Sequence, residues 1–246
     1  MVDNTIPRRR FLVGAGLAST AVAAGLASET PNPIQAETST TPVPAPPSAQ
    51  AARTEPELLL ALTATEAAFI TAAVDTLIPA DELSPSGSDC GIVIFIDRQL
   101  ASDWGGGAKM YRSGPFHKGK PEQGYQLALT PRQFFQTGIA EANNWSQKTH
   151  GKELDGLSQP ARVEALKAME EGKAEFASLG SRAFFNALLS LTMEGFFSDP
   201  AYGGNRDCVS WKMLGFPGLP ATYANRFEEY RNKRYVAQPR SIADFS

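Results

Sequence analysis

The sequence predicts a mainly α protein, a single helical domain with long irregular loops that follows a proline-rich linker. Apolar residues recur at three- and four-residue spacing in several stretches after residue 56, which is the period of an amphipathic helix. Two of these stretches open with capping-box sequences, and segments with the two-residue alternation of a strand are few and short. The chain has 246 residues, 42% of them hydrophobic and 20% charged, so it can bury one sizeable core.

The first expected helix follows the capping box from Thr63 to Glu66 and ends at Pro79. Its apolar face comprises Ile70, Ala73, Val74, Leu77 and Ile78. Ser88 and Asp89 are expected to cap a second helix, which stops near the glycines at 105–107. Residues 105–129 are rich in glycine, proline and polar side chains and predict a long loop, and loops of this length inside compact domains often serve binding.

Three more helices are expected further along the chain. One follows the capping box that starts at Thr130, with proline at the first helical position. Another is capped by Ser158 and ends at Gly172, and the last starts at Ser181 and ends before Asp199 and Pro200. The tail from Pro217 onward holds at most one short helix, near residues 223–234.

Residues 1–36 have the composition of a bacterial export signal. A basic stretch precedes an uncharged, weakly apolar run over residues 11–26, which is shorter than the roughly 20 residues of a membrane-spanning helix. The motif resembles that of a twin-arginine signal, although Pro7 stands where a polar residue is usual; it comprises Arg8, Arg9, Arg10, Phe11 and Leu12. We expect cleavage after Ala36, and an uncleaved anchor helix or a basic amphipathic arm is the alternative.

Residues 37–56 form the expected linker, because five prolines among Thr, Ser and Ala favour an extended, solvated chain. The helical domain is then expected over residues 57–246.

The sequence offers no pattern for a cofactor, a metal or a catalytic nucleophile. His117 and His150 are far apart and match no metal-binding spacing, and two cysteines are too few for an iron–sulfur cluster. Dinucleotide, phosphate-loop, haem-attachment and nucleophile-elbow motifs are also missing. The net charge of −3 gives no electrostatic argument for binding nucleic acid. We therefore expect no cofactor and no catalytic residue in this chain.

Residues 194–218, called the aromatic segment below, crowd five aromatic side chains around turn-forming glycines. Aromatic residues, arginine and methionine are favoured at protein interfaces, so the segment could form a partner surface. The other interpretation is an aromatic-rich core loop, and composition alone favours it. The candidates for partner contact are Tyr202, Asn205, Arg206, Trp211 and Phe216, with Tyr202 and Trp211 as the expected anchors.

The same residues carry a family resemblance. Three runs of the aromatic segment, 194–200, 202–207 and 211–218, resemble the signature of the small (gamma) subunit of membrane-bound gluconate 2-dehydrogenase, whose relatives serve fructose and sorbitol dehydrogenases. Residues 95–100, 111–116 and 123–127 agree with that family, and the resemblance covers about residues 60–220.

The resemblance implies a non-catalytic subunit of a three-subunit oxidoreductase in the periplasm, attached to the inner membrane through the complex. A large subunit would hold FAD, a multi-haem cytochrome c would pass electrons to the quinone pool, and this chain would escort the large subunit during export. Two other functions stay open: a hydrolase that uses an acid pair such as Asp199 and Asp207, and a stand-alone periplasmic binding protein.

The two cysteines add a further expectation. An even count in an exported chain slightly favours a disulfide between Cys90 and Cys208, which would tie the second helix to the aromatic segment. Two buried thiols, or a bond from one of them to the large subunit, are the alternatives.

Overall fold

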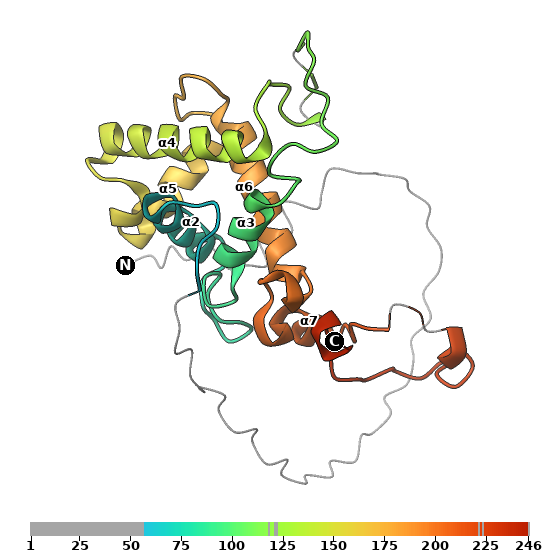
Figure 1. Ribbon diagram of the computed structural model, residues 1–246. Coiled ribbons are helices and arrows are strands. Elements are labelled where there is room, and N and C mark those ends of the chain that lie inside the picture. Colours follow the sequence, from blue (N-terminus) through green and yellow to red (C-terminus); the bar gives the residue numbers. More distant parts are fainter. Residues whose placement is uncertain (1–56, 118, 121–122, 221, 223, 246) are drawn as a thin grey trace, which may run out of the picture. The chain divides into compact units, whose positions relative to one another are not determined.

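Helices make up the regular structure of the described part of the chain. The computed structural model describes residues 57–246 apart from 118, 121–122, 221, 223 and 246, and the predicted signal and linker lie outside these residues. The helices are α2 (Ala64–Leu77), α3 (Ile92–Ala101), α4 (Pro131–His150), α5 (Gln159–Glu170), α6 (Ser181–Phe197) and the short α7 (Val209–Leu214) (Figure 1). No strand occurs among the described residues, so the mainly α prediction is confirmed.

Two helices begin as their capping boxes predict. At α2, the Thr63 hydroxyl accepts from the Glu66 N–H at 3.3 Å, and the Glu66 carboxylate accepts from the Thr63 N–H at 2.8 Å. At α4, Thr130 and Gln133 exchange the same pair of bonds at 3.2 and 3.0 Å. Each box satisfies backbone donors that the first helical turn leaves without a partner.

The expected start of the second helix is wrong. Asp75 of α2 accepts from the Ser88 N–H at 2.8 Å and from its hydroxyl at 3.0 Å, so Ser88 holds the turn before α3 against α2 instead of capping a helix. The N-cap of α3 is Gly91, in the left-handed region at φ 84° and without a side-chain cap. Glycine is required there because a Cβ would lie 2.3 Å from the carbonyl oxygen of Gly203.

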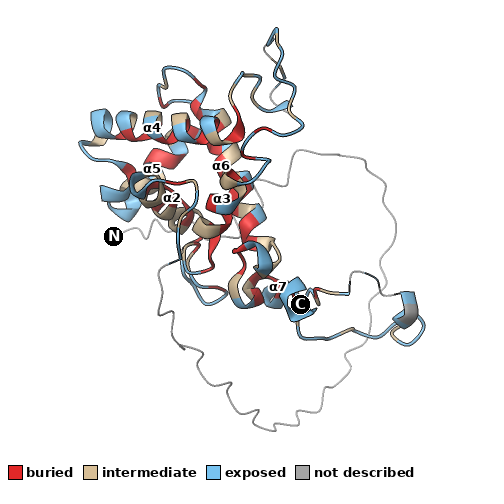
Figure 2. Cartoon of the chain, viewed as in Figure 1, coloured by how far each residue is buried: buried red, intermediate tan, exposed pale blue. Residues whose placement is uncertain are grey.

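The core forms where α2, α4 and α6 meet. Phe184 of α6 lies at the centre, with its ring 6.0 Å from that of Phe69 and 5.9 Å from that of Phe135. Gly138 lets α4 approach closely, since a Cβ there would be 2.1 Å from the Phe184 ring. Buried residues face inward between these helices, while their outer faces are exposed (Figure 2).

The irregular parts depart from the prediction in two places. The aromatic segment contains α7 and two 3-10 turns, Pro200–Tyr202 and Arg206–Cys208, where the sequence predicted only a loop. Among the described residues of the tail, the 3-10 turn Ala224–Arg226 lies where one short helix was expected, and a second turn, Ile242–Phe245, was not expected. No helix among the described residues is both long enough and apolar enough to cross a bilayer.

Candidate functional site

The aromatic segment folds around the side chain of Asn205. Asn205 is fully buried and left-handed at φ 43°, a conformation that asparagine tolerates better than most residues. Its amide nitrogen donates to the Ser198 carbonyl at 2.8 Å, and its amide oxygen accepts from the N–H and the hydroxyl of Ser210 at 2.9 and 2.8 Å. Asn205 therefore joins the end of α6 to the start of α7 and is not available to a partner.

Trp211 belongs to the core, which corrects its expected role as an anchor. It is 7% exposed, and its indole nitrogen donates to the Phe197 carbonyl at 3.0 Å. The Phe216 ring meets it edge-on, with centroids 5.1 Å apart. A buried and hydrogen-bonded tryptophan stabilises the segment and presents no surface.

Two of the candidate contact residues do face solvent. Tyr202 is 52% exposed and Phe216 is 45% exposed. The structure adds Met213 and Leu214 of α7, which sequence reasoning missed and which are 37% and 62% exposed. The sequence feature that could have indicated them is the Lys-Met-Leu run after Trp211, in which two apolar residues lie on the outer side of a very short helix. These four side chains form the accessible apolar part of the aromatic segment.

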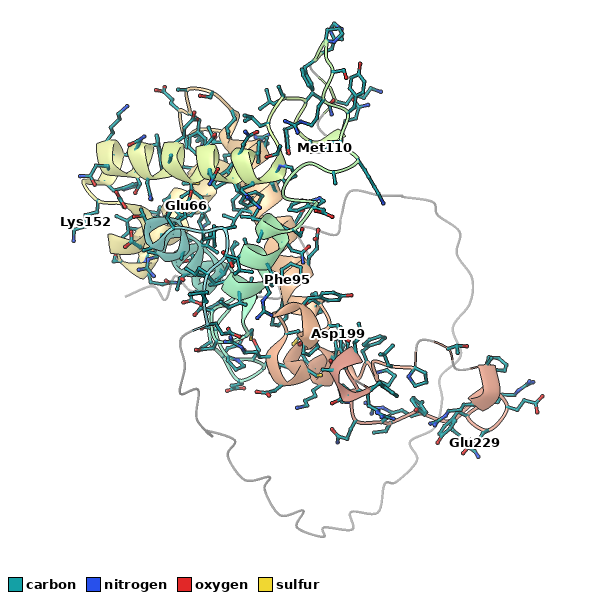
Figure 3. All side chains as sticks on the ribbon, in the orientation of Figure 1. Glu66, Phe95, Met110, Lys152, Asp199 and Glu229 are labelled. Atoms are coloured by element: carbon teal, nitrogen blue, oxygen red, sulfur yellow. The ribbon has the colours of Figure 1, made fainter. Side chains whose placement is uncertain are left out.

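Asp199, one member of the expected acid pair, is engaged in hydrogen bonds that hold the fold together. Its carboxylate accepts from the Ala201 N–H at 2.9 Å, from the Ser241 hydroxyl at 2.7 Å and from the Ile242 N–H at 2.9 Å. Asp207 is exposed, in the left-handed region at φ 55°. The carboxylate of Asp199 thus holds the C-terminal turn against the aromatic segment (Figure 3 marks Asp199), and the hydrolase interpretation has no support from this geometry.

Backbone hydrogen bonds extend this contact. Leu219 N–H donates to the Arg240 carbonyl at 2.9 Å, and Arg240 N–H donates to the Pro217 carbonyl at 3.1 Å. The segment from 217 to 219 and the segment from 240 to 242 consequently lie side by side.

A second group of contacts, the N-terminal clamp, holds residues 57–62 against α3 and the aromatic segment. Asp97 of α3 is 1% exposed. One of its carboxylate oxygens accepts from the N–H groups of Ala61 and Leu62 at 2.9 and 2.8 Å, and the other accepts from Leu60 at 2.7 Å. A carboxylate that accepts three backbone bonds fixes both the position and the direction of the chain entering α2.

Arg98 and Arg206 complete the clamp at Glu57. Arg206 of the aromatic segment forms an ion pair with the Glu57 carboxylate, and the Arg98 guanidinium lies 3.9 Å from it. Arg206 therefore binds its own chain, although sequence reasoning placed it on a partner surface. The clamp was missed as a whole; its one sequence signal was Asp97, a carboxylate within the otherwise apolar run of α3.

Cys90 and Cys208 are not bonded to each other in the structure, so the expected disulfide is not shown. The two segments are adjacent, as expected, because Arg206 N–H donates to the Cys90 carbonyl at 3.0 Å. Both side chains are buried thiols, and the Cys90 sulfur donates to the Pro85 carbonyl at 3.6 Å. Loss of solvent raises the pKa of the Cys208 thiol, which keeps it protonated and slow to exchange.

The histidines lie apart from these groups. His117 is exposed, and the His150 ring meets the Trp145 ring edge-on at 5.5 Å. In the described residues, no three His, Cys, Asp or Glu side chains are arranged to hold a metal ion.

A scan against protein-family models matches residues 64–218 with the model described as gluconate 2-dehydrogenase subunit 3. The matched region runs from the start of α2 to the end of the aromatic segment. A search of curated proteins and a search of solved structures each return no match.

Proposed function

This chain belongs to the gluconate 2-dehydrogenase subunit 3 family and is thus a subunit of a multi-subunit dehydrogenase complex; from this premise we propose that it is a non-catalytic accessory and export-escort subunit of a periplasmic, FAD-dependent sugar or sugar-acid dehydrogenase. The proposed partners are a large subunit that holds FAD and a multi-haem cytochrome c. The complex works at the inner membrane, and this chain reaches the membrane only through the complex.

The family match carries the proposal, because it spans the whole aromatic segment. The structure supports an accessory role because polar residues of that segment form hydrogen bonds and an ion pair within the chain itself. Asp199, Asn205 and Arg206 all bind the chain's own groups, so they act as scaffold. The accessible side chains of the segment fit contact with another protein, since aromatic residues and methionine are enriched at interfaces.

The escort role rests on the predicted signal in residues 1–36. A single signal on this chain suffices for two proteins if the large subunit folds, binds its FAD and docks before export. The test replaces Arg8, Arg9 and Arg10 together with lysine, which keeps the charge and removes the guanidinium groups. We expect this chain and the FAD-containing subunit both to remain in the cytoplasm, measured by fractionation; normal periplasmic amounts of both would refute the escort role.

The complex itself is tested by affinity purification of a tagged full-length chain from its native host. We expect flavin and haem absorbance in the purified material, and loss of periplasmic dehydrogenase activity when the gene is deleted. A colourless monomer, together with unchanged dehydrogenase activity in the deletion strain, would contradict the proposal. Turnover of a sugar by the purified chain alone would assign the chemistry to this chain instead.

A further inference from the structure

The segment between α3 and α4 is the largest feature that the proposed function does not yet use. Figure 1 shows it leaving the helices after α3 and returning to the start of α4. We call residues 104–117 the basic arm. Residues 110–117 form neither helix nor strand, and most of their side chains are exposed.

The basic arm combines exposed aromatic rings with positive charge. Trp104, Tyr111 and Phe116 are 44%, 70% and 37% exposed. Lys109 and Arg112 are exposed as well, and no ion pair is found for either among the described residues. The sequence has no Asp or Glu between Asp103 and Glu122, although the chain as a whole has a net charge of −3. The positive charge is thus local to this arm and opposite in sign to the rest of the protein.

The base of the arm is fixed to the helices. Arg132, in the first turn of α4, donates from its guanidinium to the Leu100 carbonyl at 2.7 Å and from its N–H to the Gly105 carbonyl at 3.0 Å. A Cβ on Gly105 would lie 2.1 Å from the Leu100 carbonyl oxygen, so only glycine fits where the arm leaves α3. On the return side, the Tyr125 ring stacks on the Phe134 ring of α4 at 4.0 Å.

The tip of the arm also has a defined shape. The Tyr111 hydroxyl donates to the Gly114 carbonyl at 2.8 Å, which closes a turn around residues 111–114. Because the shape exists before binding, the entropy lost on contact with a partner is smaller than for a disordered loop.

We propose that the basic arm docks on an acidic surface with apolar recesses on another subunit of the dehydrogenase complex. This inference rests on the proposed function, which supplies the partner. Charge complementarity determines the sign of that surface, and the three aromatic rings supply the apolar contact. A subunit is favoured over a membrane surface because the family match makes this chain part of a multi-subunit complex, and the vesicle measurement below tests the membrane alternative.

The test compares matched charge reversals in a tagged full-length chain co-expressed with the rest of the complex. Lys109→Glu with Arg112→Glu alters the arm, and Lys148→Glu with Lys152→Glu makes the same change at the far end of α4, where Figure 3 marks Lys152 away from Met110. We expect the arm variant to recover at least about tenfold less of the other dehydrogenase subunits in low salt, with a smaller difference from wild type in high salt. The control variant should recover wild-type amounts.

A second pair of variants tests the apolar contact. Tyr111→Ala should raise the dissociation rate of the complex by about tenfold or more, as for an aromatic residue at the centre of an interface. Tyr111→Phe keeps the ring and loses only the hydrogen bond to Gly114, so it should have a smaller effect. Circular dichroism and thermal unfolding check that each variant folds, and Arg112→Gln alone replaces the double variant if that one does not.

The outcomes separate the inference from the proposed function. Wild-type recovery of dehydrogenase subunits by both arm variants overturns the inference and leaves the proposed function intact. If the arm variants lose binding to phosphatidylglycerol vesicles but recover the dehydrogenase subunits as wild type does, the inference is also overturned and the arm binds a membrane. If the wild-type chain itself recovers no dehydrogenase subunit, the proposed function fails and the inference fails with it.

Discussion

Asp97 is expected to be the most sensitive polar residue of the domain. Its carboxylate accepts three backbone N–H groups from residues 60–62, and replacing it with alanine leaves all three without their partner. Leu62 is buried, so leaving its N–H without an acceptor costs the full desolvation penalty, about 1–3 kcal/mol. Leu60 and Ala61 are more accessible, and water can replace much of each bond, at about 0.5–1.5 kcal/mol each. The sum is about 4 kcal/mol.

A loss of that size is large for any domain, because domains are typically stable by about 5–15 kcal/mol. Urea unfolding of the full chain, followed by circular dichroism, measures it, and a thermal scan should show a midpoint lower by about 10 °C. Asp97→Asn should lose about half as much, since one amide oxygen remains to accept while the amide nitrogen faces a backbone donor.

Asp103→Ala is the matched control. It removes the same charge just beyond the end of α3, where the side chain is exposed, and should change the free energy of unfolding by less than about 0.5 kcal/mol. Hydrogen exchange adds a local readout, because protection of the Leu62 amide should fall in Asp97→Ala before global unfolding. If the two alanine variants unfold within about 0.5 kcal/mol of each other, the clamp does not stabilise the domain.

Other predictions concern packing and the thiols. Gly138→Ala should lower the free energy of unfolding by about 2 kcal/mol, because the clash of the new methyl with the Phe184 ring costs more than the higher helix propensity of alanine gains. An unchanged urea midpoint would argue against this packing. Trp211→Ala should lower the free energy of unfolding by about 3–5 kcal/mol, and Trp211→Phe should lower it clearly less. An alanine variant that is as stable as wild type but no longer binds the other subunits would show that Trp211 acts at the interface. Thiol counting on the denatured, unreduced chain should find both Cys90 and Cys208, with slow labelling before denaturation, and a count of zero would show that they are bonded.

The parts of the fold that could be predicted from the sequence are those set by neighbouring residues. The capping boxes at Thr63 and Thr130 act over three residues, so a short motif contains the whole interaction. Gly91 shows the limit of such reasoning. The position of the second helix depends on the carbonyl of Gly203, which is more than a hundred residues away in sequence.

The location of the candidate site stays a prediction from the sequence, and the internal contacts of the aromatic segment were not predicted. The aromatic segment stood out through its composition, and the structure confirms that it is ordered. Composition does not distinguish an inward ring from an outward one, and so Trp211 and Tyr202 were assigned the same role although one is buried and the other exposed. The N-terminal clamp could not be predicted from the sequence, because Asp97 binds residues 35 to 37 positions earlier in the chain and no local motif marks the contact.

The contact between Asp199 and the C-terminal turn orders events during synthesis. The hydroxyl of Ser241 and the N–H of Ile242 reach Asp199 only after the chain from 200 to 242 has left the ribosome. Helices α2 to α6 can pack while translation continues, since domains fold from the N-terminus as they emerge. The aromatic segment is completed later than these helices, once residues 241 and 242 have emerged. A premature stop codon near residue 240 would therefore disturb the segment around Asp199, some forty residues upstream, more than the tail in which it falls.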